Sequence, residues 1–177
     1  MDCQTDYLYK GLKIRKLGHS EVAWIHELMQ DVVSRLPQNV LFAMDDQDYF
    51  HDLLEQNGEI YGAYNQEILV AYSVLASPGK AEGNLGREFG VPEAELPRVW
   101  VLDSTIVHES GRGLGLQRLF NDLREQRARQ LGGHYLYATV HPDNAASLRN
   151  LEHAQLVLQF TRPMYGGVLR HCLAKKL

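Results

Sequence analysis

The chain has 177 residues, 45% of them hydrophobic and 23% charged, as in a soluble globular protein, and we expect one domain over residues 1–177. Its formal net charge of −4 argues against nucleic acid as a partner, because general nucleic-acid binding needs a basic face. No apolar run approaches the roughly 20 residues that cross a bilayer, and no secretion signal is found at the N-terminus, so we expect a cytoplasmic protein with no membrane partner. The two cysteines, Cys3 and Cys172, are too few for a disulfide scaffold or a cysteine zinc site, and we expect no metal.

The first half of the chain predicts one strand, two helices and a pair of strands. Apolar residues recur at helical spacing in the helical stretches, and the strand stretches are rich in β-forming residues. The expected elements are a strand over 12–17, a helix from Ser20 to Pro37, a second helix beginning at Asp45 and Asp46 with Tyr49 in its buried stripe, and two adjacent antiparallel strands over 59–64 and 68–75.

A long polar segment and a strongly apolar strand occupy the middle of the chain. Residues 77–97 carry several glycines and prolines, and a short helix is expected at Glu93–Leu96. A connection of that length is usually functional or mobile. The stretch 99–107 is apolar on both faces, which predicts a central strand covered on both sides. Strict alternation would place on one face Val99, Val101, Asp103, Thr105 and Val107.

The second half predicts two further helices and three strands. These are a helix from Leu116 to Leu131 that stops at Gly132-Gly133, a strand over 135–140, a helix capped by Asp143 or Asn144, and closing strands over 156–160 and 167–173. Strands and helices mixed in this order indicate an α/β or α+β structure with helices on both faces of a mixed sheet.

A glycine-rich turn over 110–115 lies between the central strand and the next helix. Glycines there let the backbone approach a ligand, and the free amides of a helix N-terminus attract anions. Arg112 adds a cation suited to phosphate. We therefore expect a ligand that carries phosphate, or else a tight turn whose glycines serve only chain reversal.

Two familiar phosphate motifs fit this turn poorly. A nucleotide P-loop would require a Lys after its last glycine, and none follows Gly115. A dinucleotide fingerprint would require a third glycine where Leu116 stands, although a nucleotide-binding enzyme stays open as a rival.

The turn and a second segment together resemble the GNAT superfamily of N-acetyltransferases. Ser110-x-x-Gly113-x-Gly115 resembles the acyl-CoA turn [RQ]-x-x-G-x-[GA], and the segment 139–152 resembles the second signature, with Asn144 and Ser147 in its N-x-x-S pattern. The likeness spans Val99 to about Phe160, and the first half resembles the family in element order. It implies a mixed, mostly antiparallel sheet of six to seven strands, helices on both faces and a splayed central parallel pair.

The resemblance also implies acetyl-CoA as co-substrate, with no metal. The pantetheine arm would bond backbone groups of Ile106 and Val107, and Asn144 and Ser147 would line the other side of the cofactor. The pyrophosphate would rest on the amides of Arg112, Gly113, Leu114 and Gly115. From the residues alone, Asn144 equally serves as a helix cap and Ser147 as a small packing residue.

Asp103 is the candidate general base. An alkyl ammonium must lose a proton before it attacks a thioester, and a carboxylate that interrupts the apolar face of a central strand needs a reason to be there. The alternative is that Asp103 accepts structural hydrogen bonds. Glu59, acting through water, is a second candidate, and His108 and His141 follow strand ends but equally read as surface residues.

Three departures from the GNAT pattern bear on catalysis more than on cofactor binding. Ser110 replaces the usual Arg or Gln, and the linker from Val107 to Gly113 is about two residues short. Leu151 stands where many family members have a Tyr acid, which Tyr165 or Tyr137 would have to replace.

We therefore expect an N-acetyltransferase acting on a primary amine of a small molecule or a protein. The alternative is a non-catalytic acyl-CoA-binding sensor or scaffold. The acidic balance favours a cationic acceptor such as a polyamine, an aminoglycoside or lysine. A homodimer through the closing strands stays open.

Overall fold

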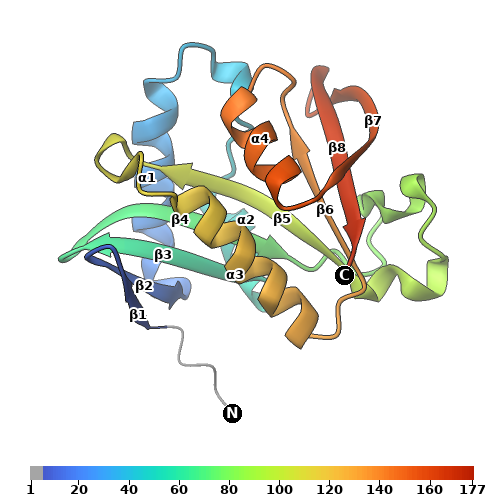
Figure 1. The fold of residues 1–177 in the computed structure, drawn as a ribbon, viewed down its shortest axis with the longest axis horizontal. Coiled ribbons are helices and arrows are strands. Elements are labelled where there is room, and N and C mark those ends of the chain that lie inside the picture. Colours follow the sequence, from blue (N-terminus) through green and yellow to red (C-terminus); the bar gives the residue numbers. More distant parts are fainter. Residues whose placement is uncertain (1–5) are drawn as a thin grey trace.

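Within the described part of the chain, one twisted sheet of eight strands runs through the molecule, and helices cover both of its faces (Figure 1). The computed structural model describes residues 6–177, so Cys3 lies outside the described residues. The strands are β1 (Tyr7–Tyr9), β2 (Leu12–Leu17), β3 (Glu59–Asn65), β4 (Ile68–Ala76), β5 (Val99–Val107), β6 (Tyr135–Val140), β7 (Val157–Met164) and β8 (Val168–Lys176). The helices are α1 (Val22–Ser34), α2 (Gln47–Glu55), α3 (Leu116–Gln130) and α4 (Ala145–His153), with short 3₁₀ turns η1 (His19–Glu21), η2 (Asn39–Leu41), η3 (Leu85–Phe89), η4 (Glu93–Arg98) and η5 (Glu109–Gly111).

The strand order is β1-β2-β3-β4-β5-β6-β8-β7, and every neighbouring pair is antiparallel except β5 and β6. The expected mixed, mostly antiparallel sheet is confirmed, but it has eight strands where six to seven were predicted. The additional strand is β1, whose three residues are too short for a periodic pattern. A tight turn at Lys10 and Gly11, both with positive φ (48° and 84°), folds it onto β2.

The central parallel pair is splayed, as the family resemblance implied. Strands β5 and β6 pair only from Val99↔Tyr135 to Val101↔Tyr137, close to the start of each strand. Beyond Val101, β5 stays paired with β4 on its other side and β6 with β8. The two strands therefore diverge toward their carboxyl ends and leave a wedge between them (Figure 1).

Each pair of helices covers one face of the sheet. Helices α1 and α2 share one hydrophobic cluster with β3 and β4, built around Ile25, Met29 and Phe50. Helices α3 and α4 pack on the opposite face, where Ala128 and Leu151 join a second cluster with β5, β6 and β8. In Figure 1 the latter two helices lie in front of the sheet and α1 lies behind it. No helix within residues 6–177 has the length and apolar character needed to cross a membrane.

A bulge in β5 overturns the predicted alternation of its side chains. Ser73 and Leu75 of β4 pair with Thr105 and Leu102, so β5 holds one extra residue at this point. After the bulge the faces exchange, and Val107 packs in the α3 cluster with Leu116 and Phe120. Thus Val107 does not share a face with Val99, because strict alternation holds only in a regular ladder.

Candidate active site

A cavity of about 950 Å³ occupies the wedge between β5 and β6. Its walls come from residues 101–105 of β5 and 137–140 of β6, and from the facing residues of α2, α3 and α4. The loop around η2 and the β7–β8 hairpin close its other end. A cavity at the point where parallel strands separate is a common place for a ligand in α/β proteins.

Asp103 lies in this cavity at the bulge of β5. Its Oδ2 accepts a hydrogen bond from the hydroxyl of Tyr49 on α2. Burial raises the pKa of Asp103, while the bond from Tyr49 and the positive charge of Arg124 act in the opposite direction. A recessed carboxylate with a raised pKa can take up a proton near neutral pH more readily than an exposed one.

A second carboxylate, that of Asp45, stands beside this pair just before α2. Burial raises the pKa of Asp45 to about 7, and the charges of Asp103 and Asp46 add to the effect. Asp46 has a different task, since its Oδ1 accepts the amide N–H of Tyr49 at 2.8 Å and caps α2. The sequence pattern placed Tyr49 in a buried helical stripe, so its hydroxyl and Asp45 were both missed as site residues.

Arg124 of α3 binds the backbone at the bulge from the face of the sheet opposite to α2. Its side chain is 2% exposed and donates five hydrogen bonds, two of them to backbone carbonyls at the bulge: Val74 O at 2.7 Å and Asp103 O at 3.3 Å. Burial lowers the pKa of Arg124 to about 9. The negative charge of the Asp103 carboxylate acts in the opposite direction, because it favours the protonated guanidinium. Arg124 thus fixes the backbone that carries Asp103.

The glycine-rich turn leads into the N-terminus of α3, where Gln117 lines the cavity, whereas residues 110–115 are outside its lining. Gly113 and Gly115 have φ of 76° and 81°, which explains glycine at both positions. The amide of Arg112 donates to Glu109 O at 3.2 Å, whereas those of Gly113, Leu114 and Gly115 have no backbone partner within residues 6–177. Three of the four amides predicted to hold a pyrophosphate are therefore available.

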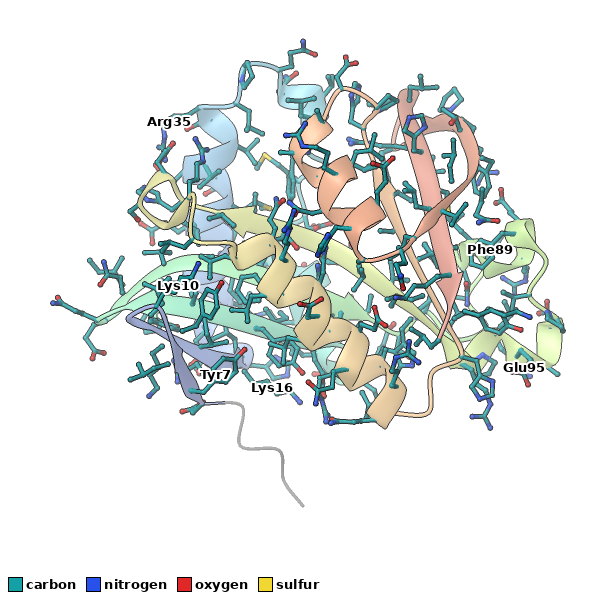
Figure 2. All side chains as sticks on the ribbon, in the orientation of Figure 1. Tyr7, Lys10, Lys16, Arg35, Phe89 and Glu95 are labelled. Atoms are coloured by element: carbon teal, nitrogen blue, oxygen red, sulfur yellow. The ribbon has the colours of Figure 1, made fainter. Side chains whose placement is uncertain are left out.

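The β1–β2 hairpin supports this turn from outside. The Tyr9 hydroxyl and the Lys10 ammonium both donate to Leu114 O at 2.9 Å. Figure 2 shows Lys10 at the hairpin tip, beside the start of α3. Its cation adds to the positive end of the helix.

The structure brings some predicted cofactor residues to the cavity and leaves others outside its lining. Asn144 and Ser147 line it, and Asn144 Oδ1 also caps α4 by accepting the amide of Ser147 at 3.2 Å. Ile106 and Val107 pack in the clusters of α1 and α3, and residues 101–105 line the cavity in their place. The pantetheine contacts assigned to Ile106 and Val107 stay a prediction.

Glu59, the second candidate base, lies outside the cavity lining. It is 5% exposed and accepts hydrogen bonds from Lys16, Arg127 and Tyr61. Burial alone would raise the pKa of Glu59, but these donors lower it to about 2. A carboxylate held in this way is a structural anion. His108 is likewise engaged, with its Nδ1 next to Ser110 Oγ at 2.8 Å.

Both tyrosines considered as proton donors line the cavity. The Tyr165 hydroxyl lies 3.1 Å from Thr139 Oγ1 in β6, and the Tyr137 hydroxyl accepts the amide of Leu85 at 3.4 Å. Burial raises the pKa of both, so both are protonated at neutral pH. Leu151 is 5% exposed and contributes only an apolar wall.

Comparison with known proteins gives a result for structure and none for sequence. No family model and no curated protein matches this sequence. Among solved structures, yncA of Salmonella typhimurium, assigned as an acetyltransferase and solved with acetyl-CoA, has a TM-score of 0.70 at 17% identity over 95% of each chain. A ribosomal-protein-alanine N-acetyltransferase from Brucella melitensis has a TM-score of 0.70 at 19% identity, covering 93% of this chain and 99% of that one. An acetyltransferase of the GNAT family from Streptococcus pneumoniae has a TM-score of 0.70 at 14% identity, covering 94% and 99%.

Proposed function

Since this chain has the fold of the GNAT acetyltransferases, we propose that it is an acetyl-CoA-dependent N-acetyltransferase acting on a primary amine by direct attack in a ternary complex. The observation that carries the proposal is the position of Asp103. Its carboxylate is recessed in the wedge between the two diverging strands and hydrogen-bonded by Tyr49.

The chain's own groups suit acetyl-CoA at this place. The available amides of Gly113, Leu114 and Gly115, together with the helix N-terminus of α3, would hold the diphosphate. The pantetheine arm would follow the edge of β5 between Val101 and Thr105, which faces the cavity and lacks β6 as a partner beyond Val101. Asn144 and Ser147 would bound it on the α4 side.

When bound, acetyl-CoA supplies an acetyl thioester, whose carbon–sulfur bond breaks as the amine nitrogen bonds to the acetyl carbon and CoA leaves as the thiol. Asp103 accepts a proton from the incoming ammonium, because an alkyl amine with a pKa of about 10 is almost fully protonated at neutral pH. Tyr49 orients the carboxylate through its hydrogen bond. Tyr165, protonated and lining the cavity, would donate a proton to the leaving sulfur.

A non-catalytic acyl-CoA sensor is the second candidate, and one observation favours it. Leu151 has no proton to donate where related enzymes have a tyrosine, and it is buried. A thiol-release assay with acetyl-CoA and a panel of amines separates the two. The enzyme hypothesis expects CoA release that depends on one class of amine. CoA binding with no amine-dependent release would favour the sensor.

A further inference from the structure

The end of the cavity near η2 and the β7–β8 hairpin contains a buried arginine that has no counterion among the described residues. Arg170 of β8 lines the cavity and is 5% exposed. Its guanidinium donates to two backbone carbonyls of η2, Val40 O at 2.8 Å and Leu41 O at 3.2 Å, and its buried Nε has no partner among the described residues. Within residues 6–177 no carboxylate lies within 4.0 Å of it, which is the distance of an ion pair. Holding a guanidinium in such a place costs free energy unless a ligand completes it.

The other two arginines of the cavity differ from Arg170. Arg162 at the rim forms an ion pair with Glu88, and Arg124 uses its guanidinium on five acceptors. A guanidinium has five N–H donors, and within residues 6–177 Arg170 uses two of them. Among the described residues, Arg170 is therefore an arginine of this cavity with charge and N–H donors left for an anionic ligand.

Two carboxylates line the same cavity as Arg170. The carboxylates of Asp45 and Asp103 both line the cavity, and neither forms an ion pair within the part of the chain that the structure describes. Charges of both signs act on Tyr165. Burial raises the pKa of the Tyr165 hydroxyl most. The charges of Asp103 and Asp45 also raise this pKa, and the charge of Arg170 lowers it. The guanidinium of Arg170 also lies over the Tyr165 ring, 5.7 Å from its centre.

We infer that the acceptor is a zwitterionic amino acid, whose ammonium group lies against Asp103 and Asp45 while its carboxylate pairs with Arg170. This inference rests on the proposed acetyl transfer and narrows its substrate class. A polycation, which the net charge of the chain favours, would bring positive charge to Arg170. A peptide N-terminus would leave Arg170 without an α-carboxylate, because the α-carboxyl group of the first residue is part of the peptide bond.

The test compares matched acceptors that differ only in the carboxylate. The twenty common amino acids and their carboxamides serve as probes with acetyl-CoA, and kcat/KM is measured for each pair by thiol release. The carboxamide carries the more easily deprotonated amine, so chemistry alone favours it. We expect the preferred amino acid to exceed its carboxamide at least about tenfold in kcat/KM, equivalent to about 1.4 kcal/mol.

Variants assign that preference to one side chain. In R170Q the ratio of kcat/KM between acid and carboxamide falls to one or below, whereas R170K, which keeps the charge and loses the planar guanidinium, retains part of the preference for the acid. A purely structural defect would lower both members of the pair equally and leave the ratio unchanged. R162Q is the matched control: it removes a cavity arginine that Glu88 already neutralises, and it keeps the wild-type ratio.

The wild-type protein alone can overturn the inference, even if R170Q fails to fold. Carboxamides, polyamines or peptide N-termini acetylated as fast as the best free amino acid would contradict it while leaving acetyl transfer intact. An unchanged ratio in folded R170Q would also contradict it. If acetyl-CoA binds but no amine of any class increases the release of CoA, the result would instead count against the proposed function.

Discussion

Replacing Asp103 by Asn tests the assignment of the general base, because the amide keeps the size of the carboxylate and cannot accept the proton. General base catalysis contributes about 10²- to 10⁴-fold, so D103N should lower kcat by that factor while the affinity for CoA changes little. Asp52 offers a matched control, since it is an exposed carboxylate of the same cavity, one turn of α2 beyond Tyr49. D52N should change kcat less than about threefold if the loss in D103N comes from base catalysis and not from charge.

The variant Y49F sharpens this test through pH. The hydrogen bond from Tyr49 lowers the pKa of Asp103, so its removal raises that pKa. A hydrogen bond to a charged group is worth about 1.5–3 kcal/mol, or about one to two pKa units. The acid limb of kcat/KM should therefore move to higher pH in Y49F by at least about one unit, measured with one amine whose own ionisation is common to both proteins. Wild-type activity in D103N, or an acid limb displaced to lower pH in Y49F, would refute the assignment.

Three further substitutions probe the turn and the buried carboxylates. G113A places a side chain at a φ of 76°, a conformation that costs about 1–2 kcal/mol, so calorimetry should show CoA binding weakened about fivefold or more, and an unchanged Kd would contradict the role of the turn. D45N removes a carboxylate whose pKa is raised to about 7 in the folded protein, so ionised Asp45 destabilises the folded state at pH values above its unfolded pKa. Urea unfolding should show D45N more stable than wild type at pH 8 and no more stable near pH 4. Equal gains in stability at both pH values would contradict this. E59Q removes a carboxylate whose pKa is lowered to about 2, so the variant should be less stable than wild type at pH 7, and this difference should fade as the pH falls from about 4 to 2. The folded fraction of E59Q should keep its activity. Loss of activity without loss of stability would make Glu59 a candidate for the base again.

The sequence was sufficient for the elements that have a strong local signal. The glycine-rich turn before α3 and a cap for α4 at Asp143 or Asn144, of which the structure selects Asn144, followed from residue types and spacing. Asp103 was found because a carboxylate is out of place in such a strand. Each of these signals lies within a few consecutive residues.

The remainder depends on contacts between distant segments. The bulge in β5 arises from its pairing with β4, and no residue in the stretch 99–107 predicts it. Tyr49 and Asp45 look like the beginning of an ordinary helix, and Arg170 like a polar residue of a closing strand; only the fold turns all three toward one cavity. Strand β1 was missed because three residues carry too little pattern.

A crystal structure with coenzyme A tests the central claim most directly. We predict the diphosphate on the amides of Gly113 to Gly115 and the sulfur in the wedge between β5 and β6, on the side where Asp103 and Tyr49 meet. A coenzyme bound elsewhere on the chain, or a wedge that side chains close while the coenzyme fails to bind, would contradict the account.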